Sequence, residues 1–240
     1  MDNCIVEEIT KEELLEQLDP RWKKRLDKIE DRLYWDDIVS RINASIAEGK
    51  LVMPSISRIF QALNKTPMDK FRVLLIGQDP YPNIGVATGY AFSLFPGEYL
   101  QSSLERIFVE IDNEYGSNLC RTHKSNGSLV NWVNQGVMLL NTVLTTDGYK
   151  SPHMSCKWQK FVHEVVEYLD ANYRFVTIAL GAEARKVAEH VVSNKDLIIT
   201  AGHPSARNAS SIFIGSNCFA KCNDLLIKNE LMPINWILPK

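Results

Sequence analysis

Three polar side chains with the means to do chemistry follow short apolar runs in this chain. Asp79, Asn141 and His203 each lie within three residues of the end of such a run. A carboxylate, an amide and an imidazole offer charge, paired donor and acceptor atoms, and a ring N–H. Bulky apolar runs with turn residues behind them predict buried strands. Because ligands of open parallel sheets bind beyond the carboxyl ends of the strands, these side chains predict a site.

The elements that must position these residues follow from hydrophobic periodicity. Strands are expected at 73–76, 137–140, 175–180 and 197–200. Helical spacing is typical of 10–19, 32–48, 55–64, 102–111, 157–171, 182–193 and 217–229. Strands that alternate with helices predict an α/β fold: a single-domain, three-layer α/β/α sandwich around a short, mainly parallel four-stranded sheet. The expected sheet core is Val73, Leu75, Val137, Leu139, Val176, Ile178 and Ile198.

Two further details concern the helix starts. Thr10, with Glu13 three residues later, is a plausible N-cap. Ser102 or Ser103 is expected to cap the helix that runs through Leu104 and Ile107. Strand order cannot be read from one sequence.

Length and composition favour one soluble domain over residues 1–240, with residues 1–20 as an acidic helical segment. No apolar stretch approaches the ~20 residues of a membrane span, and the acidic N-terminus lacks a signal pattern. Five cysteines without framework spacing favour reduced thiols. We therefore expect a cytoplasmic monomer, or a nuclear or viral-replication location in a eukaryotic or viral source.

The charge balance is uneven along the chain. The net charge is −2, but residues 1–20 hold seven acidic residues and one basic residue. The remainder has 26 basic against 22 acidic residues, a balance of +4. This balance allows nucleic-acid binding without demonstrating it.

Three motifs carry a resemblance to a known family. Residues 77–81 (GQDPY) with 89–93 (GYAFS) resemble the water-activating motif of family 1 uracil-DNA glycosylases. Residues 139–145 (LLNTVLT) resemble their uracil-reading strand end, and 203–205 (HPS) the start of their DNA-intercalating loop. The similarity covers roughly 70–236 and keeps the motif order. It implies an enzyme that flips uracil out of DNA and hydrolyses its N-glycosidic bond, leaving an abasic site for base excision repair.

The resemblance implies a role for each catalytic residue. Asp79 would stabilise the positive charge that develops on the sugar and orient the attacking water. His203 would donate a hydrogen bond to uracil O2 as negative charge develops, a kind of interaction that typically lowers a barrier by ~3–4 kcal/mol. Alternatives based on the residue types remain: Asp79 as a turn residue before Pro80, and His203 as a packed histidine at a strand end.

Other positions would bind the base. By resemblance, Asn141 reads the uracil edge, Phe92 stacks on the flipped base, and Tyr81 excludes the thymine methyl group. Backbone amides around Gln78 would hold uracil O2. As alternatives, Asn141 could cap the following turn and Phe92 could be an ordinary core residue.

The DNA-facing positions match the family only partly. Ser103 and Ser205 match hydroxyl residues that contact DNA phosphates, and Arg207 falls where a leucine wedge is expected. Pro82 replaces a usual histidine, Ala182 a usual serine, and Ser210 and Ser211 an aromatic-or-histidine and arginine pair. The alternative for Arg207 is a solvated loop residue. The chemistry looks intact, whereas the handling of duplex DNA looks altered.

No metal or cofactor is implied. Cys218 and Cys222 lack a nearby partner pair for zinc, and no phosphate-cradling glycine loop is present. The expected partner is uracil-containing DNA, single- or double-stranded; a protein inhibitor or replication partner is undetermined.

Two alternatives to an active glycosylase remain. One is a replication-accessory DNA-binding protein on the same scaffold, which Pro82 and the basic loop suggest because they resemble poxviral members. The other is an unrelated nucleotide-binding enzyme.

Overall fold

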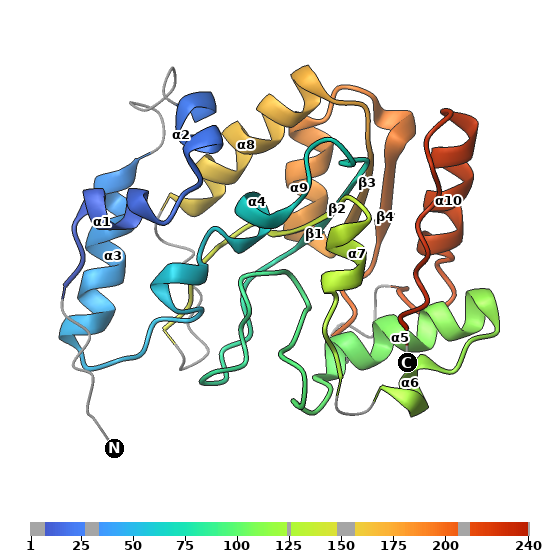
Figure 1. Cartoon of the computed structure of the whole chain (residues 1–240), viewed down its shortest axis with the longest axis horizontal. Helices are drawn as coiled ribbons and strands as arrows, with labels where there is room; N and C mark the ends of the chain where they lie inside the picture. The colour runs from blue at the N-terminus through green and yellow to red at the C-terminus, as the bar shows by residue number, and fades with distance from the viewer. Residues whose placement is uncertain (1–7, 27–33, 124–125, 148–156, 206–211, 240) are drawn as a thin grey trace.

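A parallel β-sheet organises the molecule (Figure 1). The computed structural model describes residues 8–26, 34–123, 126–147, 157–205 and 212–239. The strands are β1 (Val73–Gly77), β2 (Val137–Asn141), β3 (Val176–Leu180) and β4 (Ile198–Ala201), in the spatial order β2-β1-β3-β4. All paired strands are parallel. The predicted four-stranded α/β fold is therefore confirmed.

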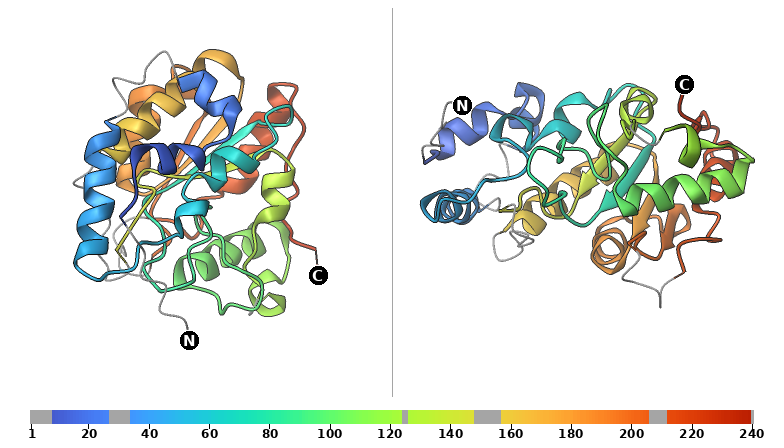
Figure 2. Two further views of the ribbon diagram at one scale, coloured as in Figure 1. Left: turned by 60° about the vertical axis from the view of Figure 1, so that its left-hand side comes forward. Right: turned by 90° about the horizontal axis from the view of Figure 1, so that it is seen from below.

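Helices cover both faces of this sheet (Figures 1 and 2). On one face lie α8 (Trp158–Asn172) and α9 (Ala182–Val191), which pack together. On the other lie α7 (Val130–Asn134) against β2 and α10 (Cys218–Lys228) against β3 and β4. Their broad apolar stripes supply the burial that holds the layers together.

The remaining helices lie around the sheet. Helix α5 (Ser102–Tyr115) runs beyond the carboxyl end of the strands and packs on α6 (Leu119–Thr122) and α10. The other described helical segments precede β1: α1 (Lys11–Glu16), α2 (Pro20–Leu26), α3 (Trp35–Ala47), the 3-10 turn Ile56–Arg58 and α4 (Gln61–Lys65).

The first part of the chain is tied to the body by buried contacts. Thr10 and Glu13 form the predicted capping box at the start of α1. The fully buried indole of Trp22 donates to the Leu63 carbonyl at 2.8 Å. A buried indole with a satisfied N–H contributes apolar area without an unpaired donor. The helical expectation for 10–19 is confirmed only for Lys11–Glu16.

Three expectations about local structure were wrong. Residues 55–64 form two short helical pieces rather than one helix. Gln101, and neither serine, precedes α5 as its N-cap residue. The fourth strand is not buried on both faces: β4 lies at the sheet edge, where Ile199 is buried and Ile198 only partly so. Because alternate side chains of a strand point to opposite faces of the sheet, Ile198 and the exposed Thr200 share the less covered face of β4.

Gly136 allows the chain to pass from α7 into β2. Its φ is +92°, and a Cβ there would lie 1.9 Å from the Lys70 carbonyl oxygen. Its own carbonyl accepts from the backbone N–H groups of Arg72 and Val73 at the start of β1. This close approach aligns the first two strands, because a larger residue would separate them.

We expect Gly136→Ala to destabilise the protein more than Gly97→Ala. Gly97 has the same φ of +92° but open space around its Cβ position. The Gly97→Ala substitution should therefore lower the free energy of unfolding only by the left-handed backbone strain, about 1–2 kcal/mol. Gly136→Ala should add about 1–3 kcal/mol from overpacking. Urea unfolding of both variants measures the difference, and equal losses would show that the backbone contact does not matter.

Candidate active site

A pocket of about 120 Å³ opens at the carboxyl edge of the sheet. Four chain segments form it: the loop after β1, the start of α5, the end of β2 and the residues after β4. Its lining residues are Asp79, Pro80, Tyr81, Pro82, Ala87, Gly89, Tyr90, Phe92, Ser103, Asn141 and His203. The structure therefore brings together Asp79, Asn141 and His203, as the sequence predicted.

The loop that carries Asp79 is fastened to the end of β2. The backbone N–H of Val143 donates to the Gln78 carbonyl at 2.9 Å, and the Thr142 hydroxyl donates to the same oxygen at 2.9 Å. Gln78 itself is not among the lining residues. Burial raises the pKa of the Asp79 carboxyl to about 6, because a low-dielectric site disfavours its charged form.

His203 is held as a neutral ring. The backbone N–H of Ser205 donates to His203 Nδ1 at 3.0 Å, so Nδ1 is an acceptor and Nε2 carries the proton. Burial lowers the pKa of this imidazole, which favours the same neutral form. The pocket thus contains both a ring N–H donor and a carboxylate.

Asn141 reaches the pocket because Gly77 has no side chain. The two residues are partners in the β1–β2 register. A Cβ on Gly77 would lie 2.5 Å from Asn141 Oδ1 and 3.1 Å from the ring of Phe92. Gly77 therefore provides the space in which the amide and the aromatic ring lie against β1.

Tyr81 and Phe92 are linked across the pocket. The Tyr81 hydroxyl donates to the Phe92 carbonyl at 3.0 Å, and burial raises the pKa of this phenol. Phe92 has a φ of +63°, which is uncommon for a bulky residue and clusters at functional sites. Its ring lies 6.0 Å from the His203 ring, centroid to centroid. Phe92 is thus both a buried core residue and a pocket wall.

The positions expected to contact DNA are only partly described. Ser103, in the first turn of α5, lines the pocket. Ser205 is half-buried beside His203. Arg207, Ser210 and Ser211 lie outside the described residues.

The described part of the chain has neither a metal-binding cluster nor a helix that could span a membrane. No cluster of three or more His, Cys, Asp or Glu side chains in the described ranges could hold a metal ion. Burial raises the pKa of the Cys218 thiol to about 12, which fits a structural thiol. Among the helices of the described residues, none has the length and apolar character needed to cross a membrane.

Comparison with known proteins decides the family. The model of the Uracil DNA glycosylase superfamily matches residues 64–227. The chain belongs to this superfamily.

Relatives and solved structures agree with that assignment. A uracil-DNA glycosylase of Azotobacter vinelandii is 34% identical over 226 residues, 93% of this chain and 96% of that protein. One from Oceanobacillus iheyensis is 36% identical over 221 residues, 91% of this chain and 94% of that protein. The crystal structure of mimivirus uracil-DNA glycosylase has a TM-score of 0.81 at 25% identity, covering 96% and 90% of the two chains. A variant of it was solved in complex with UGI.

For this member of the superfamily, sequence reasoning missed the residues that act through small size. Gly77 was recognised as part of a motif but not as the residue that makes room for Asn141. A Cβ on Gly181 would lie 3.0 Å from His203 Cβ, so this glycine does the same for the imidazole. Tyr90, Ala87 and Pro82 also line the pocket. A glycine at the end of a buried strand is the signal that could have identified Gly77 and Gly181.

We expect Asp79→Asn to stabilise the fold at neutral pH. The pKa of Asp79 rises from 3.8 to about 6 on folding, so its ionised form destabilises the native state by about 3 kcal/mol at most above pH 6. This effect fades as the pH falls from 6 and is absent below about 3.8. Denaturant unfolding at pH 7.5 and pH 4 measures it. The exposed Asp69→Asn is the control, and an equal gain there would contradict the assignment.

Proposed function

We propose that this chain is a family 1 uracil-DNA glycosylase: it flips uracil out of DNA and hydrolyses the bond between the base and deoxyribose. One observation carries the proposal. Asp79, Tyr81, Phe92, Asn141 and His203, which the family resemblance selects, all line one pocket at the carboxyl edge of the sheet. The product would be free uracil and an abasic site, the starting point of base excision repair.

In the proposed reaction, two charges develop on opposite sides of the breaking bond. The electron pair of the C1′–N1 bond leaves with uracil, and positive charge appears on the sugar. The Asp79 carboxylate stabilises that charge and orients the water whose oxygen bonds to C1′. The proton that this water loses passes to Asp79 and finally to the uracil anion, which leaves as neutral uracil. The proton on His203 Nε2 hydrogen-bonds to uracil O2, where the negative charge accumulates. A neutral imidazole can donate this hydrogen bond without placing a full positive charge in the pocket.

The base is recognised by shape and by hydrogen bonds. Uracil presents an O4 acceptor beside an N3–H donor, and the Asn141 amide presents the complement. Cytosine reverses that pattern, and mismatched buried polar groups can discriminate by 10⁴ or more. Phe92 would stack on the base, worth ~1–3 kcal/mol. Tyr81, fixed by its bond to the Phe92 carbonyl, would occupy the space of a thymine methyl.

The rest of the chain would serve DNA binding. Ser103 and Ser205 are proposed phosphate contacts, Arg207 a basic wedge, and the backbone near Gln78 a further contact to uracil O2. We also propose that residues 1–240 form one domain that acts as a monomer without a metal or cofactor. Basic side chains and hydroxyls that contact phosphates position DNA but do not read its sequence.

The pH profile should separate Asp79 from His203. The proposed mechanism requires ionised Asp79, whose pKa in the free protein is about 6, so kcat/KM should fall about tenfold per unit as the pH drops below 6. This acid limb should persist in His203→Ala, with kcat lowered about 10²–10³-fold, and disappear in the slow Asp79→Asn variant. Release of uracil from an oligonucleotide measures each rate. Near-normal turnover in either variant would show that its assigned role is wrong.

Base specificity tests the placement of the pocket. Tyr81→Ala should gain thymine excision because it removes the methyl barrier, whereas Tyr81→Phe keeps the ring and should not. Asn141→Asp should gain some cytosine excision, since an ionised carboxylate accepts from the cytosine amino group. Oligonucleotides with a single U, T or C, followed by alkaline cleavage, report all three. Unchanged specificity in Tyr81→Ala and Asn141→Asp would refute the assignment.

A further inference from the structure

A buried carboxylate on α5 holds the far end of the segment that carries His203. Glu110 is completely buried. Its Oε2 accepts from the Gly215 backbone N–H at 2.6 Å, and its Oε1 accepts from the Asn217 N–H at 2.7 Å and the Ser216 hydroxyl at 3.2 Å. Asn217 is the N-cap residue of α10, so the negative charge lies at the positive end of that helix.

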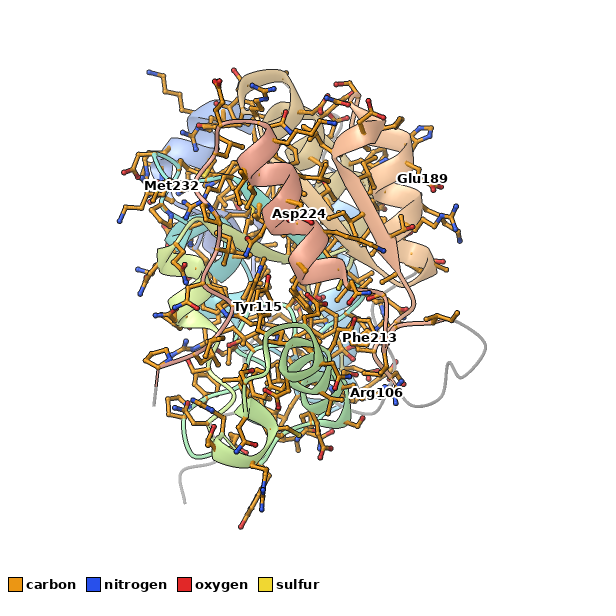
Figure 3. All side chains as sticks on the ribbon, turned by 90° about the vertical axis from the view of Figure 1, so that its right-hand side faces the viewer. Arg106, Tyr115, Glu189, Phe213, Asp224 and Met232 are labelled. Atoms are coloured by element: carbon orange, nitrogen blue, oxygen red, sulfur yellow. The ribbon has the colours of Figure 1, made fainter. Side chains whose placement is uncertain are left out.

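The next turn of α5 strengthens this attachment. Glu114 accepts from the backbone N–H groups of Phe219 and Ala220 in the first turn of α10. Burial raises the pKa of Glu114, and the adjacent Glu110 acts in the same direction. Figure 3 shows α5 end-on beneath the start of α10, with Phe213 beside both. Two carboxylates thus join α5 to the chain at 215–220.

The residues just before Gly215 are also bonded next to His203. The Gly202 N–H donates to the Ile212 carbonyl at 3.0 Å, so Ile212 lies beside the residue that precedes His203. From Glu110 the path is short: Gly215, then Ile212 three residues earlier, then Gly202 beside His203. Helix α5 also carries Ser103, which lines the same pocket.

We propose that Glu110 is a positioning residue for His203: by fixing residues 215–217 to α5, it sets where the imidazole lies relative to the rest of the pocket. Glu110 does not line the pocket and takes no part in bond breaking. The inference depends on the proposed function, because it assigns Glu110 to the same reaction. Small displacements of a catalytic group are costly, and about 1 Å can cost 10²-fold in rate.

Helix α5 offers a matched control. Asp112, two residues from Glu110, accepts from the Leu119 N–H at 2.7 Å, the Cys120 N–H at 3.1 Å and the Ser117 hydroxyl. It is the same kind of carboxylate attachment, but it holds α6 and not the His203 segment. Glu110→Gln and Asp112→Asn each replace one acceptor oxygen by an NH₂ group that cannot accept from a backbone N–H.

A double-mutant cycle with His203→Ala tests the proposal. All rates are measured well below the unfolding temperature of each variant. Glu110→Gln should lower kcat on a uracil oligonucleotide at least tenfold with little change in KM, but less than twofold further in the His203→Ala background. Asp112→Asn should stay within twofold of wild type. Equal losses in both backgrounds, no loss at all, or the same loss in Asp112→Asn would overturn the proposal. If Glu110→Gln does not fold, Ser216→Ala enters the same cycle with the same non-additivity criterion.

Nitrogen NMR of the His203 ring gives a readout that does not depend on activity. In the wild type, Nδ1 should be unprotonated and Nε2 protonated, and Glu110→Gln should shift the ring signals while Asp112→Asn leaves them in place. Unchanged signals in Glu110→Gln would overturn the inference. A wild-type protein that releases no uracil would instead refute the proposed function, so the two failures are distinguishable.

Discussion

The pairing of the first two strands is the constraint on which the site depends. The parallel register places Gly77 opposite Asn141, and the chain beyond β2 continues to hydrogen-bond the carbonyl groups of Gly77 and Gln78. The carboxylate loop and the amide are therefore parts of one hydrogen-bonded structure. Because Gly77 has no Cβ, the amide and the aromatic ring can approach the backbone of β1. A shift of one residue in this register would turn Asn141 to the other face of the sheet.

Burial then acts on the carboxyl group and the imidazole of the pocket in opposite directions. It raises the pKa of Asp79 and lowers that of His203, since each charged form is disfavoured in a site shielded from water. At neutral pH the outcome is an ionised carboxylate, kept at a cost to stability, in the same pocket as an uncharged ring that can still donate. In the proposed reaction, both groups would be prepared for charges that exist only while the bond is breaking.

The sequence predicted what depends on local pattern and motif. Four apolar runs identified the strands, and the motif residues Asp79, Asn141 and His203 do line one pocket. It could not show that one face of β4 is less covered than the other, because the packing of distant elements is set by long-range contacts; hence Ile198 was wrongly placed in the core. The contact between Glu110 and residues 215–217 spans more than a hundred positions, and a glutamate on a helix gives no sign of such a partner.

The hydrogen bond from Tyr81 to the Phe92 carbonyl has a consequence for how new specificities could evolve in this scaffold. The Tyr81 side chain, which we propose excludes a larger base, and the backbone of Phe92, which we propose stacks on the base, are joined by this bond. A substitution that enlarges the pocket at Tyr81 also removes the restraint on Phe92, whose left-handed backbone needs support from its surroundings. A protein that evolved to accept a bulkier base would therefore bind the original base less well after the same substitution. It would need a second, compensating substitution before it could bind both bases.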